Sequence, residues 1–428
     1  MLPGYFQAGV SYHKQRILFV VTVCLLAVSL FCFSSKYVTS VLSKVPTFKV
    51  FQLSDTRQFM IKTYNRYNFV AFKKKPGWHF VDFPCHYTCK KHAAQVTVRF
   101  SNKASDIIGA DGVFFSTGPF TLEEWEALHY YRSPGQVWIF ATQEPAAIVA
   151  DFLPPKAYRY STYNWSFTFH STSDIHGAYG WYTPYPSPPP IKEKNWYKSK
   201  PKLAAWVSSR HCEGLGWNRT LFVLDLARHI TVDTYGKCGN ITLRKNRAIA
   251  QKVFNEYKFH LSLENSCCSE YLSEKLWNAF ENWESVPIVI GGTKEEYKRL
   301  APPHSYIHAD DFNSMEELAD YIRMVSENET LYNEYFNWRN KGYVQQQSFE
   351  YRFPVFDTGV CKIVDKMEER KSTNATGVDV FDPYGPNWFG SCYRCGEHAW
   401  IQNYNIWWRR LTFAKDWEDN RTLYWLDG

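Results

Sequence analysis

Strands and helices alternate regularly between residues 201 and 355, judged by the spacing of apolar side chains. Short, almost wholly apolar runs are typical of strands buried on both faces, whereas apolar residues three or four apart indicate amphipathic helices. The pattern predicts strands at 203–207, 230–233, 259–263 and 286–290, and helices at 217–229, 243–257 and 273–283. Another helix is expected to open at Ser314, with Glu317 completing a capping box. Such alternation predicts a parallel, doubly wound α/β sheet.

The region from 61 to 182 contains similar short apolar runs, such as Gly112–Phe115 and Val137–Phe140, which predict buried strands. Between the two regions, five prolines fall within residues 184–190 and exclude both a helix and a central strand. We therefore expect a stiff linker at 183–200 between two Rossmann-like doubly wound domains. Their cleft would bind a nucleotide at the carboxyl ends of the strands.

The longest apolar run spans residues 17–35 and contains no charged side chain. It nearly spans a bilayer core of about 30 Å, and the basic residues before it favour a cytosolic N-terminus. The alternative, a cleaved signal peptide, would have a shorter apolar region and a small-x-small cleavage site, which Phe33 and the two serines after it do not provide. We therefore predict a cytosolic tail at 1–16, a transmembrane signal anchor at 17–35 and a stem at 36–60. Everything after the anchor would be lumenal.

Composition narrows the class of protein further. With 45% hydrophobic and 21% charged residues among 428, the chain can bury a sizeable core, which excludes a disordered or collagen-like protein. The net charge of +7 is modest and scattered, so it does not indicate nucleic-acid binding. The high aromatic content, 18%, fits a packed core first and sugar-binding platforms second.

A lumenal location agrees with the glycosylation sequons and the cysteines. The six N-x-[ST] sequons begin at Asn164, Asn218, Asn240, Asn328, Asn374 and Asn420. Nine cysteines lie outside the anchor, and an oxidising compartment favours disulfides over a zinc site built from Cys85, Cys89, Cys392 and Cys395.

One disulfide is predicted from local geometry. Cys212 and Cys238 flank one predicted helix–strand unit and should meet at the same end of it. By elimination, Cys85 and Cys89 would pair with Cys392 and Cys395. That leaves Cys267, Cys268 and Cys361 for one bridge at most.

The densest polar segment follows the predicted strand at 259–263. Glu264 and Asn265 come directly after it, then Tyr271, Glu274 and Lys275 at a helix start. A helix N-terminus with a lysine in its first turn is typical of a diphosphate-binding site. An ordinary capped helix with a solvent-exposed Glu-Lys pair would show the same sequence pattern. Neither a dinucleotide-binding G-x-G-x-x-G nor a P-loop is present.

Taken together, these segments resemble the α1,3/4-fucosyltransferase family, the inverting GDP-fucose enzymes of glycosyltransferase family 10. The resemblance covers about residues 85–362. The segments that carry it are Tyr257-Lys258-Phe259, Glu264-Asn265-Ser266, Glu270-Tyr271, Ser273-Glu274-Lys275-Leu276-Trp277, Val286-Pro287-Ile288-Val289, Gly135-Gln136, Glu144-Pro145 and Asn164-Trp165-Ser166. The chain departs from the family pattern at Arg210, often Asn there, and at Ser273, usually Thr. Its C-terminal Cys-x2-Cys also stands about 30 residues later than usual.

The resemblance implies a role for each of six residues. Glu144 matches the family's proposed catalytic base, and Arg219 and Lys275 match its phosphate-binding residues. Asn265, Tyr271 and Glu274 match residues that line the nucleotide and fucose. The implied fold is GT-B-like, with an acceptor-side domain at 61–182, a GDP-fucose-binding domain at 201–355 and a C-terminal extension at 356–428. No D-x-D metal motif occurs, so no cofactor is expected, with divalent metal at most a stimulant.

The expected protein is a single-pass type II Golgi membrane enzyme that moves L-fucose onto a GlcNAc hydroxyl of glycoprotein glycans in α1,3 linkage. The segment Tyr235–Asn240 is similar to enzymes that modify the N-glycan core in invertebrates and plants. A Lewis-type enzyme acting on N-acetyllactosamine is the alternative acceptor reading. A lumenal glycan-binding relative without catalysis is the non-enzyme alternative, which the presence of Glu144, Arg219, Glu274 and Lys275 together disfavours.

Overall fold

A computed structural model describes most of the chain after residue 64. The described residues are 65–73, 84–117, 119, 121–149, 153–190, 194–210, 212, 216–243, 246–347, 354–373, 377–406, 411–416 and 421–426. All of them belong to one compact unit that begins at Thr63. The predicted tail, anchor and stem lie outside the described residues. Within the described part, no helix is both long and apolar enough to cross a membrane.

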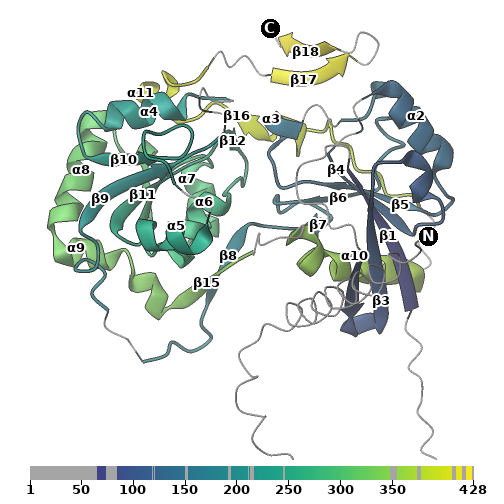
Figure 1. Ribbon diagram of the computed structural model, residues 1–428, viewed down its shortest axis with the longest axis horizontal. Coiled ribbons are helices and arrows are strands. Elements are labelled where there is room, and N and C mark those ends of the chain that lie inside the picture. Colours follow the sequence, from purple (N-terminus) through teal and green to yellow (C-terminus); the bar gives the residue numbers. More distant parts are fainter. Residues whose placement is uncertain are drawn as a thin grey trace, which may run out of the picture. The chain divides into compact units, whose positions relative to one another are not determined.

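The first half of the described chain builds a seven-stranded sheet (Figure 1) with the strand order β2-β3-β1-β4-β5-β6-β7. Neighbouring strands are parallel except for the pair β2 and β3. The two predicted strands are confirmed as β4 and β5. The strands are β1 (Asn65–Lys73), β2 (Cys85–Cys89), β3 (Ala94–Ser101), β4 (Gly112–Thr117), β5 (Val137–Ala141), β6 (Trp165–Thr168) and β7 (Ile175–His176).

Strands β4 and β5 are buried on both faces of the sheet, which explains their continuous apolar runs. Strands β2 and β3, at one edge, alternate buried and exposed residues instead. On one face, Phe115 and Trp138 pack with Trp125 of helix α2 (Leu122–Tyr131). On the opposite face, Phe114 and Phe167 pack in a second cluster with α10 (Pro354–Ser372). Helix α10 therefore returns from the C-terminal region to complete the core of the first sheet. Short α3 (Ala146–Val149) follows β5.

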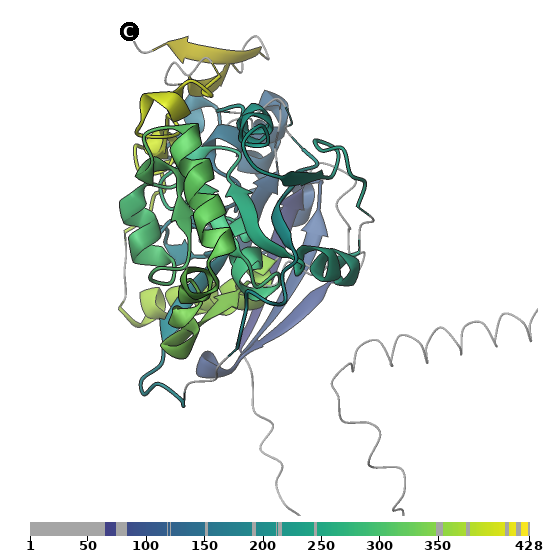
Figure 2. The same ribbon diagram turned by 90° about the vertical axis from the view of Figure 1, so that its left-hand side faces the viewer.

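The second half builds a five-stranded, wholly parallel sheet with the order β10-β9-β11-β13-β14. Its strands are β9 (Lys202–Val207), β10 (Val232–Tyr235), β11 (Tyr257–Leu263), β13 (Val286–Ile290) and β14 (Ile307–His308). Its helices are α4 (Arg219–Leu226), α5 (Arg247–Phe254), α6 (Glu274–Glu281), α7 (Lys294–Leu300), α8 (Met315–Glu327) and α9 (Glu329–Glu334). Figure 2 shows the green helices α8 and α9 facing the viewer in front of this sheet.

The prediction of two doubly wound α/β sheets is confirmed, with small shifts of the element bounds. The strand predicted at 230–233 begins two residues later, at Val232. The predicted capping box is only half formed. Ser314 Oγ accepts from Glu317 N at 3.2 Å, but the Glu317 carboxylate accepts from Asn313 N instead of from Ser314. A complete capping box forms on α7, between Thr293 and Glu296.

The strand order of the second sheet fixes where a ligand can bind. The chain moves outward from β9 to β10 and then crosses back over β9 to place β11 on its other side. This reversal of direction is the topological switch point of the sheet, and doubly wound folds bind their ligands at the carboxyl ends of the strands on either side of it. Val207 ends β9 and Leu263 ends β11. The predicted donor residues come from the segments that follow them.

Three pairs of short strands complete the structure. Strand β8 (Gly180–Pro184) pairs antiparallel with β15 (Gly342–Gln346), so the first residues of the predicted linker lie in a two-stranded ribbon. Strand β12 (Cys267–Cys268) pairs with β16 (Cys392–Tyr393), and helix α11 (Ala399–Gln402) follows. Strands β17 (Leu411–Asp416) and β18 (Arg421–Leu426) form a hairpin.

The disulfides confirm one predicted pairing and correct the others. Cys212 bonds to Cys238 as expected. Cys85 and Cys89 do not pair with Cys392 and Cys395. Cys89 bonds to Cys361, Cys267 to Cys395 and Cys268 to Cys392, while Cys85 is a buried thiol. Elimination failed because α10 carries Cys361 beneath the first sheet and because antiparallel pairing of β12 with β16 lets two adjacent cysteines reach two separate partners.

The close approach of α10 to the first sheet gives a testable prediction. A Cβ atom added at Gly359 would lie 2.0 Å from ring atoms of the buried Phe167. Although alanine favours helices, Gly359→Ala should lower the free energy of unfolding by about 1–3 kcal/mol because the core is overpacked. Denaturant unfolding of the purified protein measures this, with exposed Glu369→Ala on the same helix as the control. A stabilised Gly359→Ala protein would contradict this packing.

Candidate functional site

A buried carboxylate organises the start of α6. Glu264, the first residue after β11, is 0% exposed and accepts from Ser273 N and Ser273 Oγ, both at 2.7 Å. Lys275 Nζ lies 3.1 Å from the same carboxylate and also donates to Ser273 Oγ at 2.7 Å. The strand end and the helix start are therefore joined through one carboxylate. Glu264 thus fixes the position of the ammonium group of Lys275.

Glu264 follows a predicted strand, but no sequence pattern indicated a site role for it. A signal was present in Gly291, at the end of the neighbouring strand β13. A Cβ atom at Gly291 would lie 2.6 Å from Cγ of Glu264, so this glycine makes room for the carboxylate. The sequence showed a glycine pair without a known phosphate motif. Only the pairing of β11 with β13 explains why glycine is needed there.

Lys275 is the centre of charge in this cluster. Burial opposes its protonation, but the carboxylates of Glu264 and Glu274 raise the pKa of Lys275 above its usual value. Glu274, whose side chain is 39% exposed, lies 3.3 Å from Lys275 Nζ. Burial works against ionisation of Glu274, yet the Lys275 charge and hydrogen bonds hold the pKa of Glu274 below its ordinary value. Lys275 therefore keeps its positive charge at the start of α6, near the carboxyl end of β11.

The predicted base approaches from the first sheet. Glu144 lies three residues after the end of β5, and Tyr271 Oη donates to its Oε2 atom at 3.4 Å. The residue is exposed, yet protein atoms crowd its carboxylate. This partial desolvation, followed by the charge of Glu274, raises the pKa of Glu144. A carboxylate with a raised pKa is a stronger proton acceptor, as a general base requires.

Tyr271, just before α6 of the second sheet, contacts residues that follow strands of the first sheet. Its ring is buried, with a centroid 4.9 Å from that of Phe169, which follows β6, and 6.0 Å from that of Tyr179. The Tyr179 hydroxyl in turn donates to the Gln143 carbonyl at 2.5 Å, one residue before Glu144. The structure therefore brings two predicted site residues, Glu144 and Tyr271, into direct contact.

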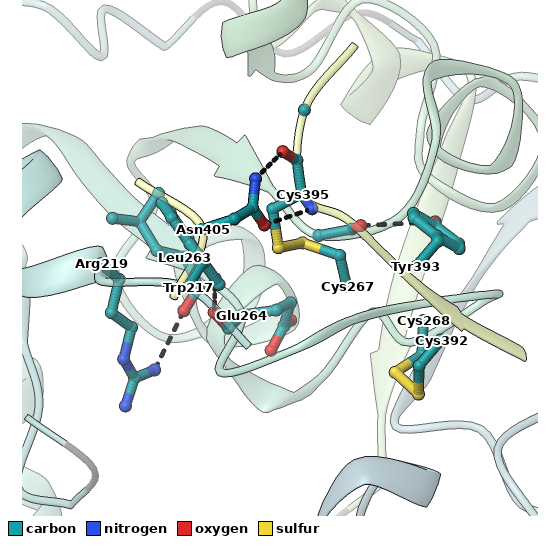
Figure 3. Close-up of a disulfide and its surroundings, with 12 residues drawn as sticks. Trp217, Arg219, Leu263, Glu264, Cys267, Cys268, Cys392, Tyr393, Cys395 and Asn405 are labelled. Carbon is teal, nitrogen blue, oxygen red and sulfur yellow. Dashed lines mark hydrogen bonds between the residues drawn. A yellow bond between two sulfur atoms is a disulfide. The ribbon is translucent and has the colours of Figure 1, made fainter. Parts of the chain in front are cut away.

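Arg219 stands at the first position of α4 and is 5% exposed. Its guanidinium donates to Leu263 O at 3.2 Å, to Ser208 Oγ at 3.0 Å and to Arg210 O at 2.9 Å. Figure 3 shows the first of these bonds. Arg219 thus bridges the carboxyl ends of β9 and β11, and its Nη1 and Nη2 atoms both donate to oxygens of the protein. Its charge nevertheless lies close enough to act on Lys275.

Asn265 lies beside this cluster and is 8% exposed. Its side-chain oxygen is buried and has no hydrogen-bond partner among the described residues. Arg219 Nε is in the same condition within that part of the chain. Buried polar atoms without partners are uncommon in folded proteins. Two such atoms, one just after β11 and one at the start of α4, therefore lie at the carboxyl end of the second sheet.

The C-terminal segment closes over the same loop (Figure 3). The disulfides Cys267–Cys395 and Cys268–Cys392 hold it two and three residues after Asn265. Farther along, Asn405 exchanges two hydrogen bonds of 2.9 Å with the backbone of Cys395. Asn218 N, at the N-cap of α4, donates to Tyr404 O at 2.7 Å. One segment therefore fastens both the loop after β11 and the start of α4.

Several known proteins are similar to this chain. Residues 197–381 match the family model described as glycosyltransferase family 10 (fucosyltransferase) C-term. Glycoprotein 3-alpha-L-fucosyltransferase A of Drosophila melanogaster is 38% identical over 185 residues, covering 42% of this chain and 36% of that protein. The human 4-galactosyl-N-acetylglucosaminide 3-alpha-L-fucosyltransferase FUT6 is 31% identical over 255 residues, covering 58% and 64%.

A third relative is the 3-galactosyl-N-acetylglucosaminide 4-alpha-L-fucosyltransferase FUT3 of Bos taurus, 34% identical over 243 residues, covering 56% of this chain and 60% of that protein. The matched part thus spans less than two thirds of each of these relatives. A crystal structure of an alpha1,3-fucosyltransferase with GDP overlays on the chain with a TM-score of 0.46 and 14% identity, over 76% of this chain and 95% of that one.

The structure distinguishes among the predicted sequons. At Asn164, Oδ1 accepts from Trp138 N at 2.8 Å and from Arg132 Nη2 at 2.7 Å, and Nδ2 donates to Asp379 O at 3.0 Å. Asn240 and Asn328 are exposed, and among the described residues only their Oδ1 atoms accept a side-chain hydrogen bond. Asn218 caps α4 through Leu221 N, whereas Asn374 and Asn420 lie outside the described residues.

We expect a glycan on Asn240 and Asn328 and none on Asn164, because a sugar on Asn164 Nδ2 would displace the backbone at Asp379. Glycopeptide mass spectrometry of folded protein secreted from a eukaryotic host measures the occupancy of each sequon. Asn164→Gln should then leave the electrophoretic mobility unchanged, while Asn240→Gln and Asn328→Gln should each increase it. A glycan found on Asn164 of the folded protein would refute this expectation.

Proposed function

We propose that the chain is a fucosyltransferase of glycosyltransferase family 10, whose family model matches residues 197–381, and that it transfers L-fucose from GDP-fucose to a glycan. The acceptor is a GlcNAc hydroxyl of a glycoprotein glycan, and the new bond is an α1,3 linkage. The observation that carries this proposal is the meeting of Glu144 and Tyr271. It brings a carboxylate with a raised pKa beside the Lys275 cluster at the switch point of the second sheet.

The reaction we propose is a single displacement with inversion. The acceptor oxygen attacks the anomeric carbon of fucose while the bond from that carbon to the β-phosphate oxygen breaks. Glu144 takes the proton that the acceptor hydroxyl loses, and GDP leaves with the bonding electrons. Negative charge builds up on the diphosphate as this bond breaks, and Lys275, oriented by Glu264, is placed to stabilise it.

The other carried-over residues have supporting roles in this proposal. Arg219 contributes positive charge from its buried position, where it joins the end of β9 to the end of β11. Asn265 supplies a buried amide oxygen whose partner the nucleotide would provide. Glu274, ionised and partly exposed, is suited to accept hydrogen bonds from ribose hydroxyls, and Tyr271 lines the fucose side. The mechanism requires no metal ion.

Acceptor choice is the open part of the proposal, because the relatives include both a glycoprotein enzyme and galactosyl-N-acetylglucosaminide enzymes. The segment Tyr235–Asn240, which favours the N-glycan core, forms a tight turn closed by the disulfide between Cys212 and Cys238. Gly236 has φ +87°, and a Cβ atom there would lie 2.4 Å from Ser208 O. The turn thus supports the loop that Arg219 contacts, on the donor side.

We further propose that residues 17–35 anchor the protein in the Golgi membrane with the described residues in the lumen. GDP-fucose is the donor in that compartment, and the acceptors are glycoproteins in transit. Comparing one core N-glycopeptide with N-acetyllactosamine as acceptors for the purified protein decides between the two readings. Formation of GDP without fucosylation of either acceptor would count against both.

Glu144→Gln should keep GDP binding but lower turnover by about 10²-fold or more, because the amide cannot accept the acceptor proton. Wild-type turnover should fall as the pH drops below the raised pKa of Glu144, since only the carboxylate acts as a base. This acid limb should vanish in the variant. Steady-state fucosyl transfer at several pH values measures both effects. Exposed Glu126→Gln on α2 is the matched control. Near-normal turnover of Glu144→Gln would rule out this base.

A further inference from the structure

The carboxylate of Glu270 joins the segment before α6 to a loop of the first sheet. Its Oε2 accepts from Ser171 N at 2.5 Å and its Oε1 accepts from Ser171 Oγ at 2.8 Å. Arg299 of α7 donates to the same Oε1 atom. Glu270 is 9% exposed, so these bonds are largely shielded from water. Ser171 lies between β6 and β7, which makes this a contact between the two sheets' loops.

The backbone of Glu270 is itself unusual. Its φ of +58° lies in the left-handed region, which a side chain with a Cβ atom adopts at a cost and glycine adopts freely. Residues held in this conformation persist when surrounding contacts determine them, and they cluster at functional sites. Here the surrounding contacts are the bonds to Ser171 and Arg299. A glycine would suit the backbone better, so the side chain is the reason to have glutamate at this position.

The contact made by Glu270 influences the proposed base, Glu144, through the next residue in the chain, Tyr271. Tyr271 follows Glu270 directly, and its ring packs on Phe169, which belongs to the loop that Ser171 anchors. The hydroxyl of Tyr271 donates to Glu144. Fixing residues 169–173 against residues 270–271 therefore fixes both the ring and the hydroxyl of Tyr271. Without the contact, Tyr271 would keep its packing on Tyr179 but lose the support of the loop that carries Phe169, so its hydroxyl would be held less firmly against Glu144.

We propose that Glu270 is a positioning residue that ties the loop 169–173 to the start of α6 and thereby holds Tyr271 against Glu144. The inference rests on the proposed fucosyl transfer for its kinetic consequences. It does not rest on it for the contact itself. Glu270 touches neither donor nor acceptor in this account and acts only through Tyr271.

Two substitutions separate positioning from folding. Glu270→Gly removes the side chain while allowing the left-handed backbone, so the protein should still fold, because relief of backbone strain offsets part of the lost hydrogen bonds. Ser171→Ala removes one of the two bonds from the other side. Both variants should bind GDP with wild-type affinity and keep the KM for GDP-fucose within about twofold of the wild-type value. In Glu270→Gly, kcat should fall at least tenfold. Exposed Glu295→Gln on α7 is the control and should behave like the wild type.

The pH profile gives a readout that a merely structural residue would not change. The groups that act on Glu144 are Glu274, Glu264, Lys275 and Tyr271, and the Tyr271 hydrogen bond lowers the pKa of Glu144. Loss of that bond in Glu270→Gly should raise the pKa of Glu144, so the acid limb of kcat should move to higher pH. An acid limb at the wild-type position together with wild-type kcat would overturn the proposal.

Hydrogen exchange without any substrate tests the contact independently of the reaction. The amide of Ser171 should exchange slowly in the wild type and at least tenfold faster in Glu270→Gly. Equal exchange in both proteins would refute the contact even if fucosyl transfer is confirmed. Faster exchange in the variant together with an inactive wild type would support the contact and reject the proposed function, which keeps the two failures distinguishable.

Discussion

A carboxylate buried completely in a protein needs compensating charge and hydrogen bonds, and Glu264 obtains both from the first residues of one helix. Ser273 supplies two donors and Lys275 supplies the charge. The end of β11, the start of α6 and the space left by Gly291 therefore depend on one another. Without the Glu264 carboxylate, the positive charge of Lys275 would lose the buried negative charge that it pairs with. The position of the proposed phosphate-binding ammonium is thus a consequence of how the second sheet satisfies a buried charge.

The rest of the structure protects this arrangement from two directions. From the C-terminal side, two disulfides and the pairing of β12 with β16 hold the loop that follows Asn265. From the first sheet, Phe169 and Tyr179 pack on Tyr271, whose hydroxyl reaches Glu144. The proposed reactive groups come from different sheets, so their geometry depends on contacts between segments that are far apart in sequence. A site of this kind is pre-organised by its surroundings before a substrate binds.

Local patterns predicted the fold well, because helices cover both sheets and central strands such as β5 and β13 are apolar along their length. The pairing of Cys212 with Cys238 was predictable for the same reason, since one helix–strand unit separates them. The other disulfides were not predictable, because they depend on where α10 and β16 return to the two sheets. The importance of Glu264 also remained hidden. A glutamate after a strand looks solvent-exposed until the neighbouring Gly291 shows that it is enclosed. Arg219 was predicted as a phosphate-binding residue from its match to the family, but its bonds to backbone carbonyls are tertiary contacts without a sequence pattern.

In the proposed reaction, Lys275, held by Glu264, receives the diphosphate of the donor, and every other role in the site follows from this one. Titration calorimetry of wild type and Lys275→Ala with GDP, and then with guanosine, tests it directly. Losing a charge-assisted contact worth about 1.5–3 kcal/mol should weaken GDP binding roughly ten- to hundredfold. Binding of guanosine, which has no phosphate, should be unchanged. Equal GDP affinity in the two proteins would contradict the account.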